Sequence, residues 1–115
     1  MSDITIYHNP RCSKSRQTLA LLKEKGADPV IIDYLNDPPS VEDLRAIHEK
    51  LGGEASALLR RKEAEYAESG LSSNSAPEAI YEAITCYPKL LERPIVVRGG
   101  QAVIGRPPET IEQLF

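Results

Sequence analysis

The amino-acid sequence predicts an α/β fold with a mixed four-stranded sheet, and three observations lead to this prediction. A β-rich segment, a helical segment and an apolar segment follow one another within residues 3–32. Two further β-branched segments flank Gly99-Gly100 near the end of the chain. The residues between these regions carry helical periodicity that proline and glycine interrupt. The predicted order is therefore strand, helix, strand, a block of helices, then strand, strand, helix.

The first three elements form a βαβ unit. Residues 3–7 are rich in β-formers and predict the first strand. Residues 13–25 follow a helical pattern, and Gly26 ends this helix. Val30-Ile31-Ile32 is a continuous apolar segment, which is typical of a buried strand that runs parallel to the first.

The middle of the chain, at about residues 40–92, predicts an inserted helical region. Ser40 and Asp43 match a capping box at the start of one helix. Residues 55–62 predict a short helix, and Pro77 suits the first turn of another.

Residues 95–97 and 102–104 predict the third and fourth strands, which a hairpin turn at Gly99-Gly100 joins. A last helix follows at residues 109–115. This order of elements is the layout of a thioredoxin-like fold with helices inserted after the second strand. We expect one domain that spans residues 1–115.

Composition and charge argue against several classes of function. A chain of 115 residues suits one domain, and its net charge of −3 argues against nucleic acid as a partner. No apolar run approaches the roughly twenty residues that cross a membrane, and the first residues do not resemble a secretory signal. Two cysteines make no disulfide framework, so we expect a cytoplasmic protein with reduced thiols. For a chain of this size a monomer is the default expectation. No cysteine or histidine pair has the spacing of a metal site, and nothing calls for a bound cofactor.

Cys12 lies between the predicted first strand and first helix, which is the usual place for a ligand in an α/β sheet. Free backbone N–H groups at the helix start favour a thiolate, as do the charges of Arg11, Lys14 and Arg16. His8 would help if it is cationic. A thiolate in such surroundings suits attack on an oxyanion or a disulfide. The alternative is a buried, inert cysteine.

The spacing around Cys12 excludes two other thiol chemistries. A phosphatase-type loop needs arginine six positions after the cysteine, where Thr18 stands. A dithiol pair needs a second cysteine at the position of Ser15. Cys12 therefore needs a thiol from outside the chain, such as glutathione or a glutaredoxin. Cys86 falls in a predicted helix, where a packing role is favoured.

Most of the Lys and Arg residues lie in or beside four short segments, at 11–16, 60–62, 93–98 and 106. In an acidic protein this grouping indicates a local anion site, because the planar guanidinium offers paired donors to an oxyanion. Arg93 precedes Pro94, and Arg106 stands between Gly105 and Pro107, so rigid turns direct both. A cis peptide bond is expected before Pro94, since the predicted fold usually has one before its third strand.

Several motifs occur together along the chain. They are His8-Asn9-Pro10-Arg11-Cys12-Ser13-Lys14-Ser15-Arg16, Tyr34-Leu35, Pro38-Pro39, Leu58-Leu59-Arg60, Arg93-Pro94-Ile95-Val96-Val97 and Gly105-Arg106-Pro107. Together they resemble the glutaredoxin-linked arsenate reductase (ArsC) family, and in particular its short housekeeping branch. The resemblance runs from about Ile4 to Phe115 and implies a thioredoxin-like fold with an inserted helical region.

The resemblance also implies a mechanism. Cys12 is the nucleophile that attacks arsenate, and His8 helps to lower the pKa of the cysteine. Asn9 and Ser15 hydrogen-bond the sulfur or the substrate. Glutathione, as co-substrate, attacks the thiolate–arsenate adduct, and glutaredoxin resolves the intermediate so that arsenite is released. The residues that match the oxyanion-binding arginines of the family are Arg60, Arg93 and Arg106.

Two other functions stay open. The same Cys12 suits a monothiol, glutathione-dependent oxidoreductase that acts on another oxyanion or on a mixed disulfide. Convergence of the three arginines near Cys12 would favour an oxyanion, and their dispersal would favour a disulfide. The third reading is a non-enzymatic, Spx-like regulator that binds RNA polymerase. Many such regulators carry a C-x-x-C switch where this chain has Cys12 and Ser15, which counts against that reading.

Overall fold

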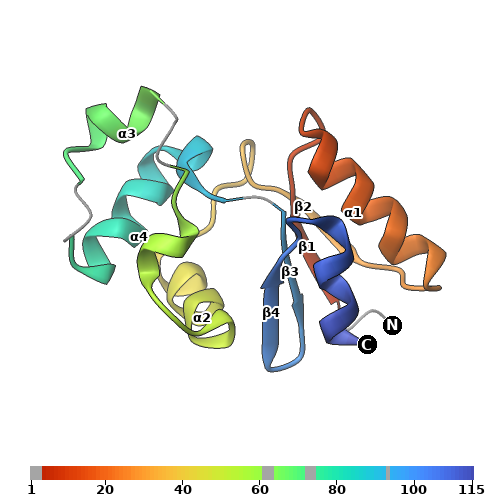
Figure 1. Ribbon diagram of the computed structural model, residues 1–115. Helices are drawn as coiled ribbons and strands as arrows, with labels where there is room; N and C mark the ends of the chain where they lie inside the picture. The colour runs from red at the N-terminus through yellow and green to blue at the C-terminus, as the bar shows by residue number, and fades with distance from the viewer. Residues whose placement is uncertain (1–3, 61–63, 72–74, 93) are drawn as a thin grey trace. The chain divides into compact units, whose positions relative to one another are not determined.

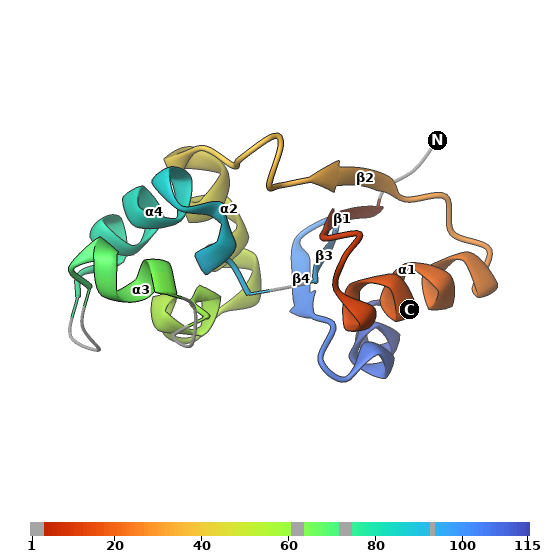
Figure 2. The same cartoon turned by 90° about the horizontal axis from the view of Figure 1, so that it is seen from above.

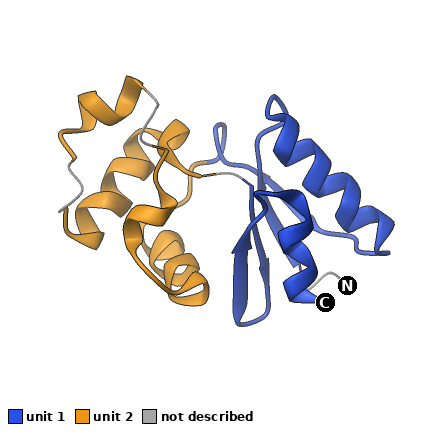
Figure 3. Cartoon of the chain, in the orientation of Figure 1, with its two compact units in different colours: residues 1–37, 93–115 blue, residues 38–92 orange. Residues whose placement is uncertain are grey.

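The computed structural model describes residues 4–60, 64–71, 75–92 and 94–115. The chain divides into two compact units, one of residues 1–37 and 93–115 and one of residues 38–92 (Figure 3). The first unit contains the β-strands, and the described elements of the second are all helical. That the whole chain forms one domain stays a prediction.

The first unit contains a mixed four-stranded sheet with the strand order β2-β1-β3-β4 (Figure 1). Strand β1 (Ile4–His8) pairs in parallel with β2 (Val30–Asp33) and antiparallel with β3 (Ile95–Arg98). Strand β4 (Gln101–Ile104) pairs antiparallel with β3. The predicted α/β class, the mixed four-stranded sheet and the order of the strands are confirmed.

Two helical elements cover one face of this sheet. Helix α1 (Ser13–Glu24) and the C-terminal 3-10 helix η3 (Pro108–Leu114) lie side by side there (Figures 1 and 2). Ile6 of β1, Leu22 of α1 and Ile111 of η3 belong to one buried apolar cluster. The sequence predicts a helix at the end of the chain, and the structure has the tighter 3-10 form there.

Strand β2 is less buried than its sequence predicts. The prediction of a buried strand is wrong, because Val30 and Ile31 are 51% and 47% exposed. The cause is the position of β2 at one edge of the sheet. Ile6, the partner of Ile31 on the central strand β1, is fully buried. The predicted parallel pairing of the two strands is confirmed.

The second unit contains helices α2 (Val41–Leu51), α3 (Ala64–Ser69) and α4 (Pro77–Cys86). The predicted capping box is present at the start of α2. Ser40 Oγ accepts from the backbone N–H of Asp43, and the Asp43 carboxylate accepts from the backbone N–H of Ser40, each at 3.1 Å. None of the helices in the described part of the chain is long and apolar enough to cross a membrane.

Two 3-10 helices, η1 (Ala55–Leu58) and η2 (Pro88–Leu90), complete this unit. The predicted helix at 55–62 is correct only for its first residues, where the structure has η1. Residues 61–63 lie outside the described residues. Pro77 stands in the first turn of α4, as predicted.

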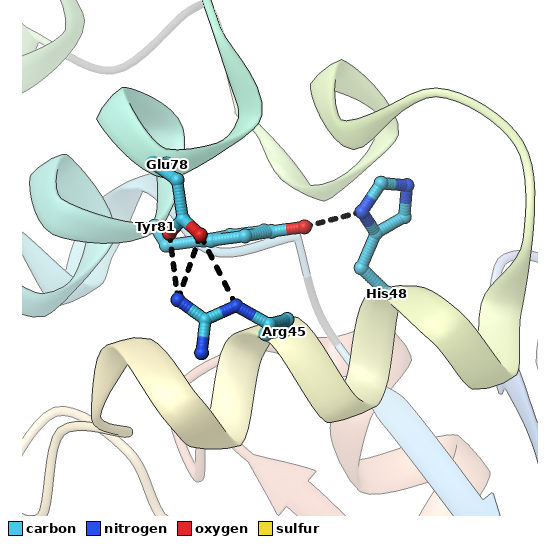
Figure 4. A network of polar contacts seen from close by, with 4 residues as sticks. All are labelled: Arg45, His48, Glu78 and Tyr81. Carbon is cyan, nitrogen blue, oxygen red and sulfur yellow. Dashed lines mark hydrogen bonds and ion pairs between the residues drawn. The ribbon is translucent and has the colours of Figure 1, made fainter.

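Polar side chains join α2 to α4 (Figure 4). Arg45 donates to both carboxylate oxygens of Glu78, at 2.7 and 2.9 Å. Nε2 of His48 lies 2.8 Å from the carbonyl oxygen of Gly53, and its Nδ1 is hydrogen-bonded to the hydroxyl of Tyr81. Because a carbonyl oxygen only accepts, Nε2 of His48 donates the proton in its contact with Gly53.

Candidate active site

Cys12 lies at the junction between β1 and α1. It is the N-cap residue of α1, with an extended backbone at φ −91° and ψ 122°. Its carbonyl oxygen accepts from the N–H of Arg16, and its own N–H donates to the carbonyl oxygen of Asn9, each at 3.0 Å. The first turn of α1 holds no acidic residue to offset the helix dipole. Cys12 therefore stands at a helix end that stabilises negative charge.

A buried polar cluster holds the loop that precedes α1. Ser15 Oγ accepts from the backbone N–H of Asn9 at 3.0 Å and lies 2.6 Å from Nδ1 of His8. His8, Asn9 and Ser15 are only 7%, 5% and 0% exposed. One hydroxyl group of α1 thereby ties residues 8 and 9 to the helix that begins at Cys12. Four predicted site residues, His8, Asn9, Cys12 and Ser15, thus belong to one short segment.

Burial lowers the pKa of His8 below its ordinary value of 6.5. Asp33, its register partner on β2, raises the pKa, while the charges of Arg16 and Lys23 lower it further. Because burial has the largest effect, His8 is neutral at neutral pH. A neutral imidazole adds no positive charge beside Cys12, and Nδ1 of His8 is in hydrogen-bond contact with Ser15 Oγ.

The cations next to Cys12 in the sequence are exposed. Arg11, Lys14 and Arg16 all lie at the surface, where water and salt weaken their effect on a thiolate. Arg16 turns back along the loop and donates from Nη1 to the carbonyl oxygen of Pro10 at 3.0 Å. The end of α1 is thus the more direct support for negative charge at Cys12.

Arg106, one of the three predicted oxyanion-binding arginines, follows β4 in the first unit. Its side chain is exposed, and its backbone N–H donates to the carbonyl oxygen of Ile104 at 2.9 Å. The peptide bond between Arg106 and Pro107 is cis. The cis bond predicted before Pro94 involves Arg93, which lies outside the described residues, so it stays a prediction.

Arg60 belongs to the second unit and forms an ion pair there. Its Nη1 donates to Oε1 of Glu92 at 3.2 Å, and both side chains are 23% exposed. Two backbone hydrogen bonds align the segments that carry them, from Arg60 N–H to Leu90 at 2.7 Å and from Glu92 N–H to Leu58 at 2.6 Å. Glu92 is not among the predicted site residues, and its one signal in the sequence is its place directly before the basic segment 93–98.

The packing role expected for Cys86 is wrong. Cys86 ends α4, is exposed, and borders a cavity of about 340 Å³. The face of α4 that is buried carries Ile80 and Ile84, and the helical period places a residue two positions after Ile84 on the opposite side. Neither cysteine forms a disulfide. Across the described residues, no group of three His, Cys, Asp or Glu side chains is placed to hold a metal ion.

Known proteins resemble this chain over almost its whole length. The model of the ArsC family matches residues 7–114. The chain is 49% identical over 113 residues to the uncharacterised protein YfgD of Escherichia coli (strain K12), covering 96% of this chain and 95% of YfgD. It is 46% identical over 117 residues to an arsenate reductase of Neisseria meningitidis, with full coverage of both. The solved structure of an arsenate reductase from Vibrio cholerae is 47% identical, covers 97% of each chain and superposes with a TM-score of 0.92. The predicted thioredoxin-like fold is thereby confirmed, and the chain belongs to the ArsC family.

Proposed function

We propose that this protein is a glutathione- and glutaredoxin-dependent arsenate reductase with Cys12 as its nucleophile. The observation that carries the proposal is the position of Cys12 at the N-cap of α1, in a loop held by buried Ser15. The N–H groups of the first helical turn stabilise both a thiolate and an oxyanion bound to it. The names of two similar proteins support arsenate as that oxyanion.

The reaction consumes two thiols from outside the chain. The Cys12 thiolate attacks the arsenic atom of arsenate, an S–As bond forms, and one arsenate oxygen leaves as water. Glutathione attacks this adduct, and glutaredoxin resolves the intermediate and releases arsenite. The two electrons that reduce As(V) to As(III) come from glutathione and glutaredoxin, which end as a mixed disulfide. Cys12 returns as a thiol, ready for another turnover in the reducing cytoplasm.

Asn9 and His8 support the reacting groups in different ways. Asn9 Oδ1 accepts from the N–H of Arg11 at 3.0 Å, but no described residue accepts from its side-chain amide nitrogen. An unmatched donor on a side chain that is only 5% exposed is costly, so we assign it a hydrogen bond to the sulfur or the oxyanion. Neutral His8 orients Ser15, which in turn fixes the loop.

We assign oxyanion binding to Arg106, and to Arg60 and Arg93 on the strength of the resemblance. Electrostatic stabilisation by such donors is the largest effect that a protein can supply to a charged intermediate. The ion pair between Arg60 and Glu92 bears on this assignment, because a carboxylate beside an arginine competes with an oxyanion for it. That pair favours the second candidate, a monothiol oxidoreductase that acts on glutathione mixed disulfides and needs no unpaired arginine.

The deciding experiment supplies the purified protein with arsenate, glutathione, glutaredoxin, glutathione reductase and NADPH. We expect arsenate-dependent loss of NADPH, abolished in Cys12→Ser and retained in the matched control Cys86→Ser. A folded, reduced protein that shows no arsenate dependence would refute the proposal. Reduction of a glutathione mixed disulfide by that same protein would then establish the second candidate.

A separate measurement tests activation of the nucleophile. Alkylation of Cys12 by iodoacetamide, followed across pH in the Cys86→Ser background, should give a pKa below the ordinary value of about 8.5. An ordinary or raised value would remove the helix end as the source of activation.

A further inference from the structure

We propose that Thr18 is a positioning residue that holds Arg106 in place relative to Cys12 and thereby strengthens binding of the oxyanion. The proposal rests on the function proposed above, in which Arg106 contacts that oxyanion. Nothing in the sequence singles out Thr18 for a function. It draws attention only as the residue six positions after Cys12, where a phosphatase-type loop would have arginine.

The hydroxyl group of Thr18 joins two segments that are distant in sequence. Thr18 is fully buried, and its Oγ1 lies 2.8 Å from the carbonyl oxygen of Lys14 and 3.3 Å from that of Gly105. A hydroxyl group has one proton to donate, so the two carbonyl oxygens share it. Lys14 belongs to the first turn of α1, and Gly105 directly precedes Arg106. The side chain therefore links the helix of Cys12 to the turn of Arg106.

Gly105 has no room for a side chain at this contact. A Cβ atom on Gly105 would lie 2.8 Å from Thr18 Oγ1 and 2.9 Å from Pro94 Cγ, closer than carbon atoms approach such neighbours. The backbone N–H of Gly105 also donates to the carbonyl oxygen of Pro94 at 2.8 Å. The backbone of Gly105 is thus held between Thr18 and Pro94, and this fixes the position from which the chain continues to Arg106.

The buried face of α1 places Thr18 beside the other residue that organises the site. Ser15, Thr18 and Leu22 are all fully buried, at the three- and four-residue spacing of one helix face. Leu22 packs in the apolar core, whereas the two hydroxyl residues nearer Cys12 each hold a separate segment. Ser15 holds the loop of His8, and Thr18 holds Gly105. One helix thereby sets the positions of Cys12, of its loop and of the Arg106 turn.

The test measures how well arsenate protects Cys12 from alkylation by iodoacetamide. Thr18→Val keeps the shape of the side chain but removes the hydroxyl group, and Thr18→Ser keeps the hydroxyl group. Thr85→Val is the matched control, because Thr85 Oγ1 likewise contacts a carbonyl oxygen of its own helix (Tyr81, 3.1 Å) and one elsewhere (Pro39, 2.9 Å). We expect Thr18→Val to raise the arsenate concentration for half protection about three- to tenfold. Thr18→Ser and Thr85→Val should change it less than about twofold.

A double-mutant cycle separates positioning of Arg106 from a general loss of structure. If Thr18 acts through Arg106, Thr18→Val has little further effect on protection in the Arg106→Gln background. Alkylation of Cys12 across pH without arsenate should be unchanged by Thr18→Val, since Ser15 still holds the loop. Additive effects of the two substitutions, or an altered pH profile, would overturn the proposal.

The outcomes distinguish this proposal from the proposed function. If arsenate does not protect Cys12 of the wild-type protein, and the protein does not reduce arsenate with glutathione and glutaredoxin, both the proposed function and this proposal are refuted. Protection that is equal in wild type and Thr18→Val, with arsenate reduction intact, refutes the role of Thr18 alone. If Thr18→Val does not fold, Gly105→Ala replaces it, because the added Cβ displaces the same contact from the other side. Gly105→Ala must then weaken protection and leave the pH profile of Cys12 unchanged, and any other result overturns the proposal.

Discussion

Replacing Ser15 by alanine should destabilise the protein more than an ordinary substitution at a helix start. Ser15 Oγ is the acceptor for the backbone N–H of Asn9 and the partner of Nδ1 of His8, and all three residues are buried. Alanine leaves both groups without a partner and without water. A buried donor left unmatched costs about 1–3 kcal/mol. The nitrogen of His8 adds less, because its neutral ring can change tautomer, so we expect a total loss of about 2–3 kcal/mol.

Equilibrium unfolding in urea, followed by circular dichroism and extrapolated to water, measures this loss. The matched control is Ser13→Ala, since Ser13 is an exposed serine in the same helical turn. An exposed substitution of this kind changes stability by no more than about 0.5 kcal/mol. If Ser15→Ala and Ser13→Ala unfold with the same free energy, the hydrogen bonds of Ser15 do not hold the loop before α1.

Three further predictions concern acidity, packing and exposure. Burial lowers the pKa of His8 in the folded protein. As pH falls below 6.5, His8 is therefore protonated in the unfolded chain before it is protonated in the folded one. The free energy of unfolding should therefore fall between pH 7.5 and 5.5, by at most about 1.4 kcal/mol per pH unit, more steeply than in His8→Gln. Parallel pH profiles would contradict this. Gly105→Ala should lower the free energy of unfolding in urea by about 1–3 kcal/mol, because the Cβ would lie within 3 Å of Thr18 and Pro94, and an unchanged midpoint would show that the turn adjusts freely. In the Cys12→Ser variant, Cys86 should react with Ellman's reagent in the folded protein, whereas a thiol that reacts only after unfolding would rule out its exposure.

The sequence predicts those features that depend on neighbouring residues. The capping box of Ser40 and Asp43 is an example, since both of its hydrogen bonds lie within one turn. The strands are another, because short runs of β-branched residues favour an extended chain locally. The burial of β2 could not be predicted in this way. Whether Val30 is covered depends on its strand being at the edge of the sheet, which is set by pairing between distant segments.

The same distinction between neighbouring and distant residues applies to the candidate site. His8, Asn9, Cys12 and Ser15 stand within one short stretch of the sequence, so their association follows from the strand–loop–helix order alone. The contact of Arg60 with Glu92 spans 32 positions. The contact of Thr18 with Gly105 spans 87. No pattern within a segment reveals such pairs, because they form only after separate elements have packed together.

The exposed strand β2 also bears on how this protein behaves at high concentration. An apolar strand at a sheet edge can pair with the same strand of another molecule and begin aggregation. Asp28 and Asp33 flank the exposed Val30 and Ile31, and Pro29 has no backbone N–H to donate. If two copies paired their strands antiparallel with Val30 opposite Ile31, Asp28 of each would lie opposite Asp33 of the other, and like charges directly opposite repel. The two carboxylates therefore oppose pairing of β2 between molecules. We expect a variant in which both are neutralised to precipitate before it shows any other defect.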